Sequence, residues 1–375
     1  MTTRPRVWII SLKYAPGLKR LFVALGESLR RRGADARYLL AQPYAGLTDV
    51  ETDGAAYLTT GTSVPVLLAE TLQHVVRRAD WARAFAAAPP DFACFYNFHP
   101  LNLFVLRHLK AAFPRCVTAL YVHEPYLPQK RPYGRKQGLY IGLLELMQGA
   151  TLRYVDRVIL PSAVAEQRFA LRHPQFAGKR HYGPFTLPDR GNGRAAARAF
   201  FTYIGLVHSA TGFDVFVDLV DHCAVRDVDA RFMAITPSPV DGYLERLSER
   251  ARARLTLVNK ATFSDGVLDL AMATSLAVFR LDREITQSAV VPVGAMYGTP
   301  AIVRDLPGFT QDVQHGYNGY VVPERCTPAD IVEGMRYVQR HFPELSANAR
   351  RAYEERWSEQ QWDCYYRWLV NLLGL

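Results

Sequence analysis

Residues 280–303 combine charged, hydroxyl and apolar side chains in an order that suits a bound phosphate group. Arg283 and Glu284 fall in a charged loop, and an apolar run that predicts a helix follows within a few residues. A helix N-terminus carries unpaired N–H groups and a partial positive charge, so it can hold an anion. The same order also suits an ordinary capped helix of an α/β sheet, and the spacing alone does not separate the two. The residues at the predicted helix N-terminus are Thr286, Gln287 and Ser288.

Further polar residues follow predicted strands in the first half of the chain. Asn97 and His99 end one strand, and His123 and Glu124 end the next. The carboxyl ends of parallel strands share one edge of a sheet, where ligands bind, so we expect these side chains to line a binding site. A histidine there can contact a reacting group, and a glutamate can accept a proton or a hydrogen bond from a hydroxyl group. Ordinary loop residues are the alternative at each position.

The loop after the first predicted strand, VWIISL, contains a Pro-Gly pair that is a weak indication of a phosphate or sugar site. Lys19 and Arg20 come just after Gly17 and could bind a phosphate on an acceptor. A solvated, charged helix start explains these two cations equally well. The sequence contains no GxGxxG, so a dinucleotide site is not favoured.

Strand and helix patterns alternate along the whole sequence, which indicates parallel sheets covered by helices. A turn-rich segment at residues 185–195 divides the pattern into two halves, and 375 residues are too many for one average core. We therefore predict an α/β protein with two Rossmann-like domains, residues 1–187 and residues 196–354. The predicted strands are residues 7–12, 36–40, 57–59, 92–96, 117–122, 157–160, 199–204, 230–236, 255–258, 276–279, 301–303 and 319–322. The predicted helices are residues 21–32, 64–76, 103–112, 138–154, 163–171, 213–223, 240–253, 267–273, 289–296, 328–342 and 347–373.

The net charge of +10 belongs to the first half of the chain. Residues 1–190 contain 26 Lys and Arg against 13 Asp and Glu, a net charge of +13, so the remainder carries −3. This asymmetry points to an anionic partner such as lipid headgroups or a phosphorylated acceptor. No nucleic-acid-binding motif is visible, so we expect no nucleic acid partner.

A basic run stands in front of the predicted helix at residues 138–154. That helix has many apolar residues, among them Leu139, Leu143 and Leu146. Cations beside apolar side chains are typical of a segment that binds a membrane surface. A solvated loop before a core helix is the alternative, and the charge of the first half favours the membrane. The basic residues are Lys130, Arg131, Arg135 and Lys136.

The scattered cysteines and the lack of a long apolar run predict a cytoplasmic protein. Five scattered cysteines form no CxxC pair, which fits a reducing compartment and neither a disulfide frame nor a zinc site. The Asp227–Asp229 stretch falls in a predicted turn, so we expect no metal site. The sequence has no apolar run of 18 residues and its start lacks the pattern of a signal peptide, so we predict at most peripheral contact with the inner face of a membrane.

Several stretches resemble the GT-B glycosyltransferases, in particular the retaining, family-4-like group. GTPAIV from Gly298 and HGYNGYVV from His315 are similar to the family block "GTPVV…DGVNGLLV". Gly205 with the later Gly-Phe-Asp resembles the family's "G-R-L…K-G-F-D" loop, and residues 350–368 resemble its last helix. The resemblance covers nearly the whole chain, although it is weak before residue 115.

This resemblance implies a GT-B fold, in which two Rossmann-like domains face each other across a cleft. A C-terminal helix at about residues 355–375 would cross back to the first domain. The first domain would bind the acceptor and the second the nucleotide-sugar donor. His123 resembles the family histidine near the reacting sugar, and Glu284 lies near the first of two family glutamates. The implied donor contacts are Gly205, His208, Lys260, Arg283, Thr286, Gln287 and Ser288. The implied acceptor contacts are Gly17, Lys19, Arg20, Asn97, His99 and Glu124.

The chain departs from the family pattern where the donor would bind. Val293 or Gly294 stands in place of the second glutamate, which holds the nucleotide ribose in the family. Leu206 and Thr211 replace the arginine and lysine that face the donor diphosphate. A UDP- or GDP-sugar is favoured as the donor, and a CMP-sugar with its single phosphate is an alternative. The cations that could compensate are Arg280, Arg283, Lys260 and His208.

We therefore predict a retaining glycosyltransferase without a cofactor or a bound metal. It would move a sugar from a nucleotide-sugar to a glycan or lipid-linked acceptor, in the synthesis of bacterial surface polysaccharide or lipopolysaccharide. Two alternatives remain open. One is a non-catalytic, GT-B-like protein that binds a glycan or acts as a scaffold, and the other is a nucleotide-sugar epimerase of the same fold.

Overall fold

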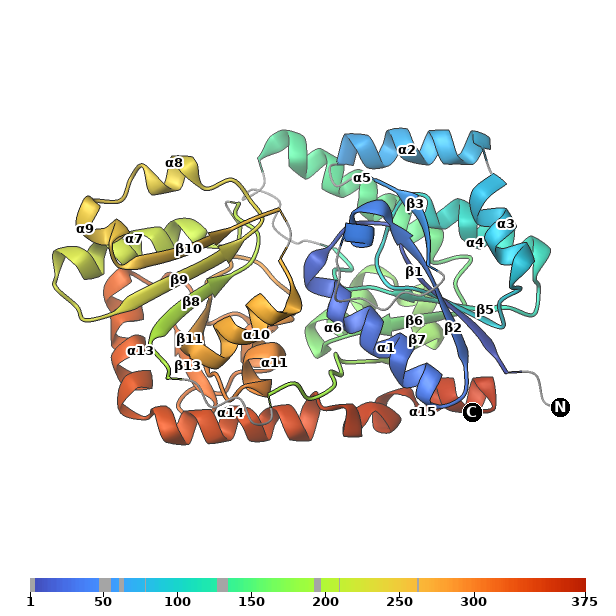
Figure 1. Ribbon diagram of the computed structural model, residues 1–375. Coiled ribbons are helices and arrows are strands. Elements are labelled where there is room, and N and C mark those ends of the chain that lie inside the picture. Colours follow the sequence, from blue (N-terminus) through green and yellow to red (C-terminus); the bar gives the residue numbers. More distant parts are fainter. Residues whose placement is uncertain are drawn as a thin grey trace. The chain divides into compact units, whose positions relative to one another are not determined.

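The chain folds into two compact units in the computed structural model (Figure 1). Unit 1 comprises residues 1–186 and 362–375, and unit 2 comprises residues 187–361. Two residues of the basic run, Lys130 and Arg131, lie outside the described part of the chain. The structure describes residues 4–46, 55–60, 64–77, 79–126, 134–191, 197–208, 210–261 and 263–375.

Unit 1 is built on a seven-stranded parallel sheet in the order β3-β2-β1-β4-β5-β6-β7. The chain builds outward from β1 in one direction and then from β4 in the other, so the strand order reverses between β1 and β4. In doubly wound sheets, ligands bind at the carboxyl ends of the strands beside such a reversal. The strands are β1 (Arg6–Ser11), β2 (Asp35–Ala41), β3 (Ala56–Thr59), β4 (Phe92–Phe95), β5 (Val117–Tyr121), β6 (Arg157–Leu160) and β7 (Arg180–Tyr182).

Helices connect these strands and cover the sheet. Besides the short 3-10 helices, helix α3 and strand β7 of unit 1 are absent from the sequence prediction. An alanine-rich stretch and a three-residue strand give only weak periodicity, which explains both omissions. No helix in the described ranges is both long and apolar enough to cross a membrane. The α-helices are α1 (Lys19–Arg31), α2 (Val64–Arg77), α3 (Ala79–Ala87), α4 (Asn102–Ala112), α5 (Arg135–Thr151), α6 (Ala163–Arg172) and α15 (Trp362–Leu373). The 3-10 helices are η1 (Pro16–Leu18), η2 (Gln42–Gly46) and η4 (Pro174–Lys179).

Unit 2 repeats this design with a six-stranded parallel sheet in the order β10-β9-β8-β11-β12-β13. Its strand order reverses between β8 and β11. The strands are β8 (Phe200–Ile204), β9 (Arg231–Thr236), β10 (Leu255–Asn259), β11 (Ser275–Arg280), β12 (Ala301–Arg304) and β13 (Gly319–Val322). The helices are α7 (Phe213–Val225), α8 (Asp241–Leu244), α9 (Glu249–Arg252), α10 (Asp265–Thr274), α11 (Val290–Met296), α12 (Pro307–Thr310), α13 (Pro328–Arg340), α14 (Phe342–Arg356) and η5 (Glu359–Gln361).

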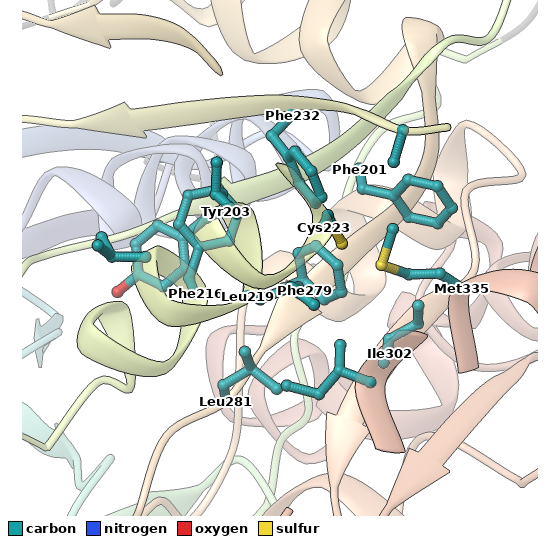
Figure 2. Close-up of a cluster of buried hydrophobic side chains, with 14 of the residues drawn as sticks. Phe201, Tyr203, Phe216, Leu219, Cys223, Phe232, Phe279, Leu281, Ile302 and Met335 are labelled. Carbon is teal, nitrogen blue, oxygen red and sulfur yellow. The ribbon is translucent and has the colours of Figure 1, made fainter. Parts of the chain in front are cut away.

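Aromatic side chains fill the core of unit 2 between its sheet and α7 (Figure 2). Phe201 and Phe279 stack across neighbouring strands with their ring centroids 6.0 Å apart. Phe216 of α7 packs against Phe279 at 5.9 Å and against Phe232 of β9 at 6.0 Å. All four rings are fully buried, so this cluster fixes α7 on the sheet and with it the loop that connects β8 to α7.

Two helices that were predicted as continuous are each divided into two helices in the structure. The helix predicted at 240–253 is two short helices, because Ser248 accepts a hydrogen bond from the Ala251 N–H and starts α9 there. The helix predicted at 347–373 ends with α14 and resumes as α15. The carbonyl of Trp357 accepts a hydrogen bond from the Leu187 N–H at 2.8 Å, so the backbone leaves the helical path at this point.

Helix α15 belongs to unit 1, although the chain passes through all of unit 2 before reaching it. The guanidinium of Arg32 lies 4.1 Å from the ring centroid of Trp362. The Tyr366 hydroxyl lies 3.3 Å from that of Tyr121, and Trp368 stacks on His181 with ring centroids 4.3 Å apart. The aromatic residues of α15 therefore serve as a packing face of unit 1.

Replacing Gly212 by alanine should destabilise unit 2. Its φ angle is +70°, and an added Cβ atom would lie 2.1 Å from the Leu281 carbonyl oxygen. We expect the free energy of unfolding, measured by urea titration, to fall by about 1–3 kcal/mol or more. Gly242→Ala is the matched control, because a Cβ atom there meets no atom within 4 Å. Equal stability of the two variants would contradict this account of the β8–α7 loop.

Candidate functional site

The carboxyl ends of β8 and β11 form the strand reversal of unit 2, and a buried ion pair lies directly beneath it. Arg280 donates hydrogen bonds to the Ile204 carbonyl at 2.8 Å and to Asp282 at 2.9 Å. Arg280 is 9% exposed and Asp282 is 4% exposed. Burial raises the pKa of Asp282, although the charge of Arg280 acts in the opposite direction. The pair therefore joins the end of β8 to the loop after β11.

Gly205 makes this arrangement sterically feasible. Its φ angle is +152°, and an added Cβ atom would lie 2.9 Å from the Arg280 Nη1 atom. Only glycine adopts this backbone region readily and leaves room for the guanidinium. The predicted importance of Gly205 thus has a structural basis, independent of any ligand.

Arg283 is held by Asp214 in a two-point ion pair, with N–O distances of 3.0 and 2.5 Å. Its backbone N–H also donates to the Ala210 carbonyl at 2.8 Å. Although burial alone would raise the pKa of Asp214, the hydrogen bonds and charge of Arg283 lower it. The prediction treats Arg283 as a cation available to a phosphate, but much of its charge is already balanced by Asp214. Asp214 belongs to the Gly-Phe-Asp stretch of the sequence, which was the signal that could have identified this partner.

The residues predicted at a helix N-terminus precede the helix. Helix α11 starts at Val290 and is seven residues long, so its dipole is small. Ser288 accepts a hydrogen bond from the Val290 N–H at 3.2 Å, and the Thr286 carbonyl accepts one from Gln311 at 2.8 Å. Thr286 and Ser288 are buried and Gln287 is half-buried, so this segment is a well-packed loop.

His208 and Lys260 occupy different parts of the sheet edge. The Nδ1 atom of His208 accepts a hydrogen bond from the Ala210 N–H at 3.2 Å, which places the ring in the β8–α7 loop beside the residues described above. Burial and the nearby Arg280 charge lower the pKa of His208, so it is neutral at neutral pH. Lys260 is exposed after the edge strand β10, two strands and about 10 Å away from β8. The structure thus gathers Gly205, His208, Arg283 and Glu284, and leaves Lys260 apart.

His123 lies at the carboxyl end of β5 in unit 1. Its Nε2 atom is 2.9 Å from the Tyr96 carbonyl oxygen, and because a carbonyl only accepts, Nε2 carries the proton. The imidazole stacks on Tyr121 with ring centroids 4.8 Å apart. Burial lowers the pKa of His123 to about 4, so the ring is neutral at physiological pH.

Asn97, His99 and Asn102 form a buried polar cluster beside the strand reversal of unit 1. The Asn97 amide donates to Ser11 at 3.0 Å and to the Lys13 carbonyl at 2.7 Å, and the Asn102 amide donates to the Asn97 carbonyl at 2.8 Å. His99 Nδ1 accepts from a backbone N–H at 3.0 Å, so Nε2 is its donor in the neutral ring. Three atoms in the cluster have no hydrogen-bond partner within the described ranges. They are Asn97 Oδ1, His99 Nε2 and Asn102 Oδ1.

Lys13, the residue that the sequence analysis missed, lies close to these histidines. Its positive charge contributes to the lowered pKa of both His99 and His123, and burial lowers its own pKa. The available signal was its position directly after the first predicted strand, the same rule that selected Asn97 and His123.

The remaining predicted acceptor residues differ in how far they are buried. Glu124 is half-buried and forms an ion pair with Arg168 at 3.7 Å. Gly17 is exposed in η1, Arg20 is half-buried, and Lys19 is only 4% exposed. The alternative of a solvated charged helix start is therefore wrong for Lys19. No group of three or more His, Cys, Asp or Glu residues suited to a metal ion occurs among the residues that the structure describes.

Residues 198–341, which contain the strand reversal of unit 2, match the family model described as "Glycosyl transferases group 1". This segment resembles the group 1 glycosyltransferases. The predicted family resemblance is thereby confirmed, and the protein is a glycosyltransferase. No curated protein matches the sequence.

Solved glycosyltransferase structures share the fold of this glycosyltransferase over nearly its full length. Sucrose-phosphate synthase from Thermosynechococcus elongatus has a TM-score of 0.75 at 15% identity, with 99% of each chain covered. WaaG, a glycosyltransferase involved in lipopolysaccharide biosynthesis, has a TM-score of 0.68 at 14% identity, over 98% of this chain and 100% of its own. HepE from Anabaena, in complex with UDP, has a TM-score of 0.67 at 12% identity, with 99% of each chain covered. The likeness confirms the predicted GT-B fold.

Two histidines of unit 1, the buried His99 and the half-buried His123, should make the stability of this glycosyltransferase depend on pH. Burial lowers the pKa of His99 to about 3 and that of His123 to about 4, from 6.5. The unfolded chain therefore binds more protons below pH 6.5, so stability is complete above that pH and is lost as the pH falls toward 4. His99→Asn keeps an acceptor for the backbone N–H and removes one titrating group. Between pH 6.5 and 5 we expect it to lose about 2 kcal/mol less unfolding free energy than the wild type.

Urea titrations at pH 6.5, 5.8 and 5.0 measure this difference. His222→Asn on α7 is the control outside the cluster and should follow the wild-type slope. Parallel slopes for wild type and His99→Asn would show that His99 is not held neutral in the folded protein.

Proposed function

We propose that this glycosyltransferase moves a sugar, with retention, from a nucleotide-sugar to a glycan or lipid-linked acceptor. Unit 2 binds the donor and unit 1 binds the acceptor. The observation that carries the proposal is the group 1 match over residues 198–341, which contain the strand reversal where Gly205, Arg283 and Glu284 come together. The structural similarity to WaaG, which is involved in lipopolysaccharide biosynthesis, supports an acceptor that is an intermediate of surface polysaccharide or lipopolysaccharide synthesis.

Glu284 is the proposed contact for the donor sugar. It is half-buried and directly follows Arg283, whose two-point pair with Asp214 fixes the backbone of the loop. A carboxylate can accept hydrogen bonds from two sugar hydroxyls, and such charge-assisted bonds are strong. HepE and GtfA are described in complex with UDP, and starch synthase IV with ADP, which supports a nucleotide as the donor carrier.

The charges around the donor loops bear on the choice of nucleotide. Arg280 and Arg283 are each paired with an aspartate of the protein, Asp282 and Asp214. A diphosphate would therefore depend on backbone N–H groups or would have to share these arginines. UDP- and GDP-sugars remain the favoured donors, and the single phosphate of a CMP-sugar makes it the alternative.

The acceptor is proposed to be neutral and rich in hydroxyl groups. The buried cluster of Asn97, His99 and Asn102 places neutral donors and acceptors beside the strand reversal of unit 1, although its three unpartnered atoms are themselves shielded from solvent. His123 is neutral and contacts the reacting sugar without adding charge. Departure of the leaving group and attack on the same face require no protein nucleophile.

A non-catalytic scaffold is the second candidate. The observation that favours it is the pairing of Arg280 and Arg283 within the protein, together with Val293 or Gly294 in place of a second glutamate. A scaffold of this kind would bind glycans through unit 1 and would show no affinity for nucleotides.

Thermal unfolding with UDP, GDP, ADP, CMP and the corresponding sugar nucleotides separates the two candidates. We expect one nucleotide class to raise the melting temperature saturably, because a ligand that binds only the folded state stabilises it. If no nucleotide in the panel changed the melting temperature, the transferase proposal would be refuted and the scaffold supported. Hydrolysis or isomerisation of the sugar nucleotide without an acceptor would indicate the epimerase.

Glu284→Ala should then reduce transfer by at least about 100-fold, because two charge-assisted hydrogen bonds of about 1.5–3 kcal/mol each disappear. Its binding of the free nucleotide should change little, since the lost contacts are to the sugar. Glu324→Ala, an exposed glutamate elsewhere in unit 2, is the matched control. An unchanged transfer rate in Glu284→Ala would remove Glu284 from the site.

A further inference from the structure

Helix α5 exposes a row of leucines. Leu139 is 77% exposed, Leu143 is 40% exposed and Leu146 is 68% exposed. Residues spaced by four and three lie on one face of a helix, so these side chains form a continuous apolar stripe. The sequence alternative of a core helix is therefore wrong for this face. An exposed apolar stripe of this length calls for a partner that covers it.

The first turn of α5 carries two exposed cations, Arg135 and Lys136. Cations at a helix N-terminus oppose the helix dipole, and no acidic residue in the turn offsets them. Neither side chain forms an ion pair among the described residues. The stability of the helix thus gives no reason for their presence, whereas binding to an anion does.

Helix α2 adds further exposed apolar side chains in the same unit. Val66 is 43% exposed, Leu72 is 69% exposed and Val76 is 77% exposed. Figure 1 draws α2 in blue and the start of α5 in green along the top of unit 1. Half of the large hydrophobic residues that are exposed in the described ranges belong to these two helices, so the apolar surface is concentrated there.

The charge of the chain selects the partner. Residues 1–190 carry a net charge of +13, so a second copy of this unit would repel the first. An anionic lipid surface matches both features of the helix, because headgroups attract cations and the acyl boundary takes up leucines. A single acidic residue, Glu145, lies within α5.

We propose that the α5 face, defined as Arg135, Lys136, Leu139, Leu143 and Leu146, docks unit 1 on an anionic lipid surface. The cations contact the headgroups and the three leucines enter the acyl boundary. The proposal does not depend on the donor site, and a protein without transferase activity would still bind vesicles. It gives the positive charge of the first half of the chain a specific target.

Sedimentation of the full chain with vesicles tests this docking. We expect binding to vesicles of phosphatidylglycerol with phosphatidylcholine, little binding to phosphatidylcholine alone, and a loss of binding as the salt concentration rises. Leu139→Glu with Leu146→Glu should lower the partition coefficient at least about tenfold. Arg135→Gln with Lys136→Gln should lower it about fivefold for each cation. Leu171→Glu on α6 is the matched control, since Leu171 is 70% exposed in the same unit.

Hydrogen exchange of the wild-type chain provides a readout that no folding defect can imitate. Vesicles of phosphatidylglycerol should slow exchange in peptides that cover α5 and leave α6 unchanged. Equal vesicle binding by the double leucine variant and the wild type would overturn the proposal. The proposal would also be overturned if the wild type eluted as a dimer in size-exclusion chromatography and the double leucine variant eluted as a monomer. The leucine stripe would then be a protein–protein interface.

Discussion

The ion pair between Arg280 and Asp282 is the interaction on which the strand reversal of unit 2 depends. Removing two charges from water costs several kcal/mol for each ion, and the loss is recovered only through good geometry and further hydrogen bonds. Here the guanidinium also binds the Ile204 carbonyl, and Gly205 leaves the space that it needs. Such a pair adds little net stability, but it allows only one relative position of the loops after β8 and β11.

The two units use the same topology for different chemistry. In unit 2 the strand reversal carries full charges that are paired, as in Arg283 with Asp214. In unit 1 burial removes the charge from His99 and His123, and Lys13 supplies the positive charge near them. Paired charges can be redistributed when an anion arrives, and neutral donors and acceptors suit hydroxyl groups.

Much of the fold is visible in the sequence, since parallel strands buried on both faces read as short apolar runs and amphipathic helices follow them. The predicted strands from VWIISL to GYVV all occur with shifts of at most two residues at their ends. Breaks caused by distant hydrogen bonds are not visible, such as the one between α14 and α15, where Leu187 meets Trp357. Local periodicity contains no information about a partner 170 residues away.

The candidate site was predictable to a similar extent. The rule that ligands bind at the carboxyl ends of strands selected Asn97 and His123, which follow β4 and β5 in the structure. It could not show that Arg283 is paired with Asp214, because an ion pair depends on how α7 packs against the sheet. Lys13 was not predicted as a site residue. Its charge helps to lower the pKa of His99 and His123, and no sequence motif indicates that proximity.

The return of α15 to unit 1 has a consequence for biosynthesis. Arg32, Tyr121 and His181 are all made before unit 2 begins, but their partners Trp362, Tyr366 and Trp368 are made after it ends. At ordinary translation speeds the ribosome needs roughly 10–35 s to cover the intervening stretch. During that time the sheet of unit 1 has emerged with one of its packing faces uncovered. A nascent chain of this protein therefore presents an aromatic-binding surface to chaperones until its own last helix arrives to occupy it.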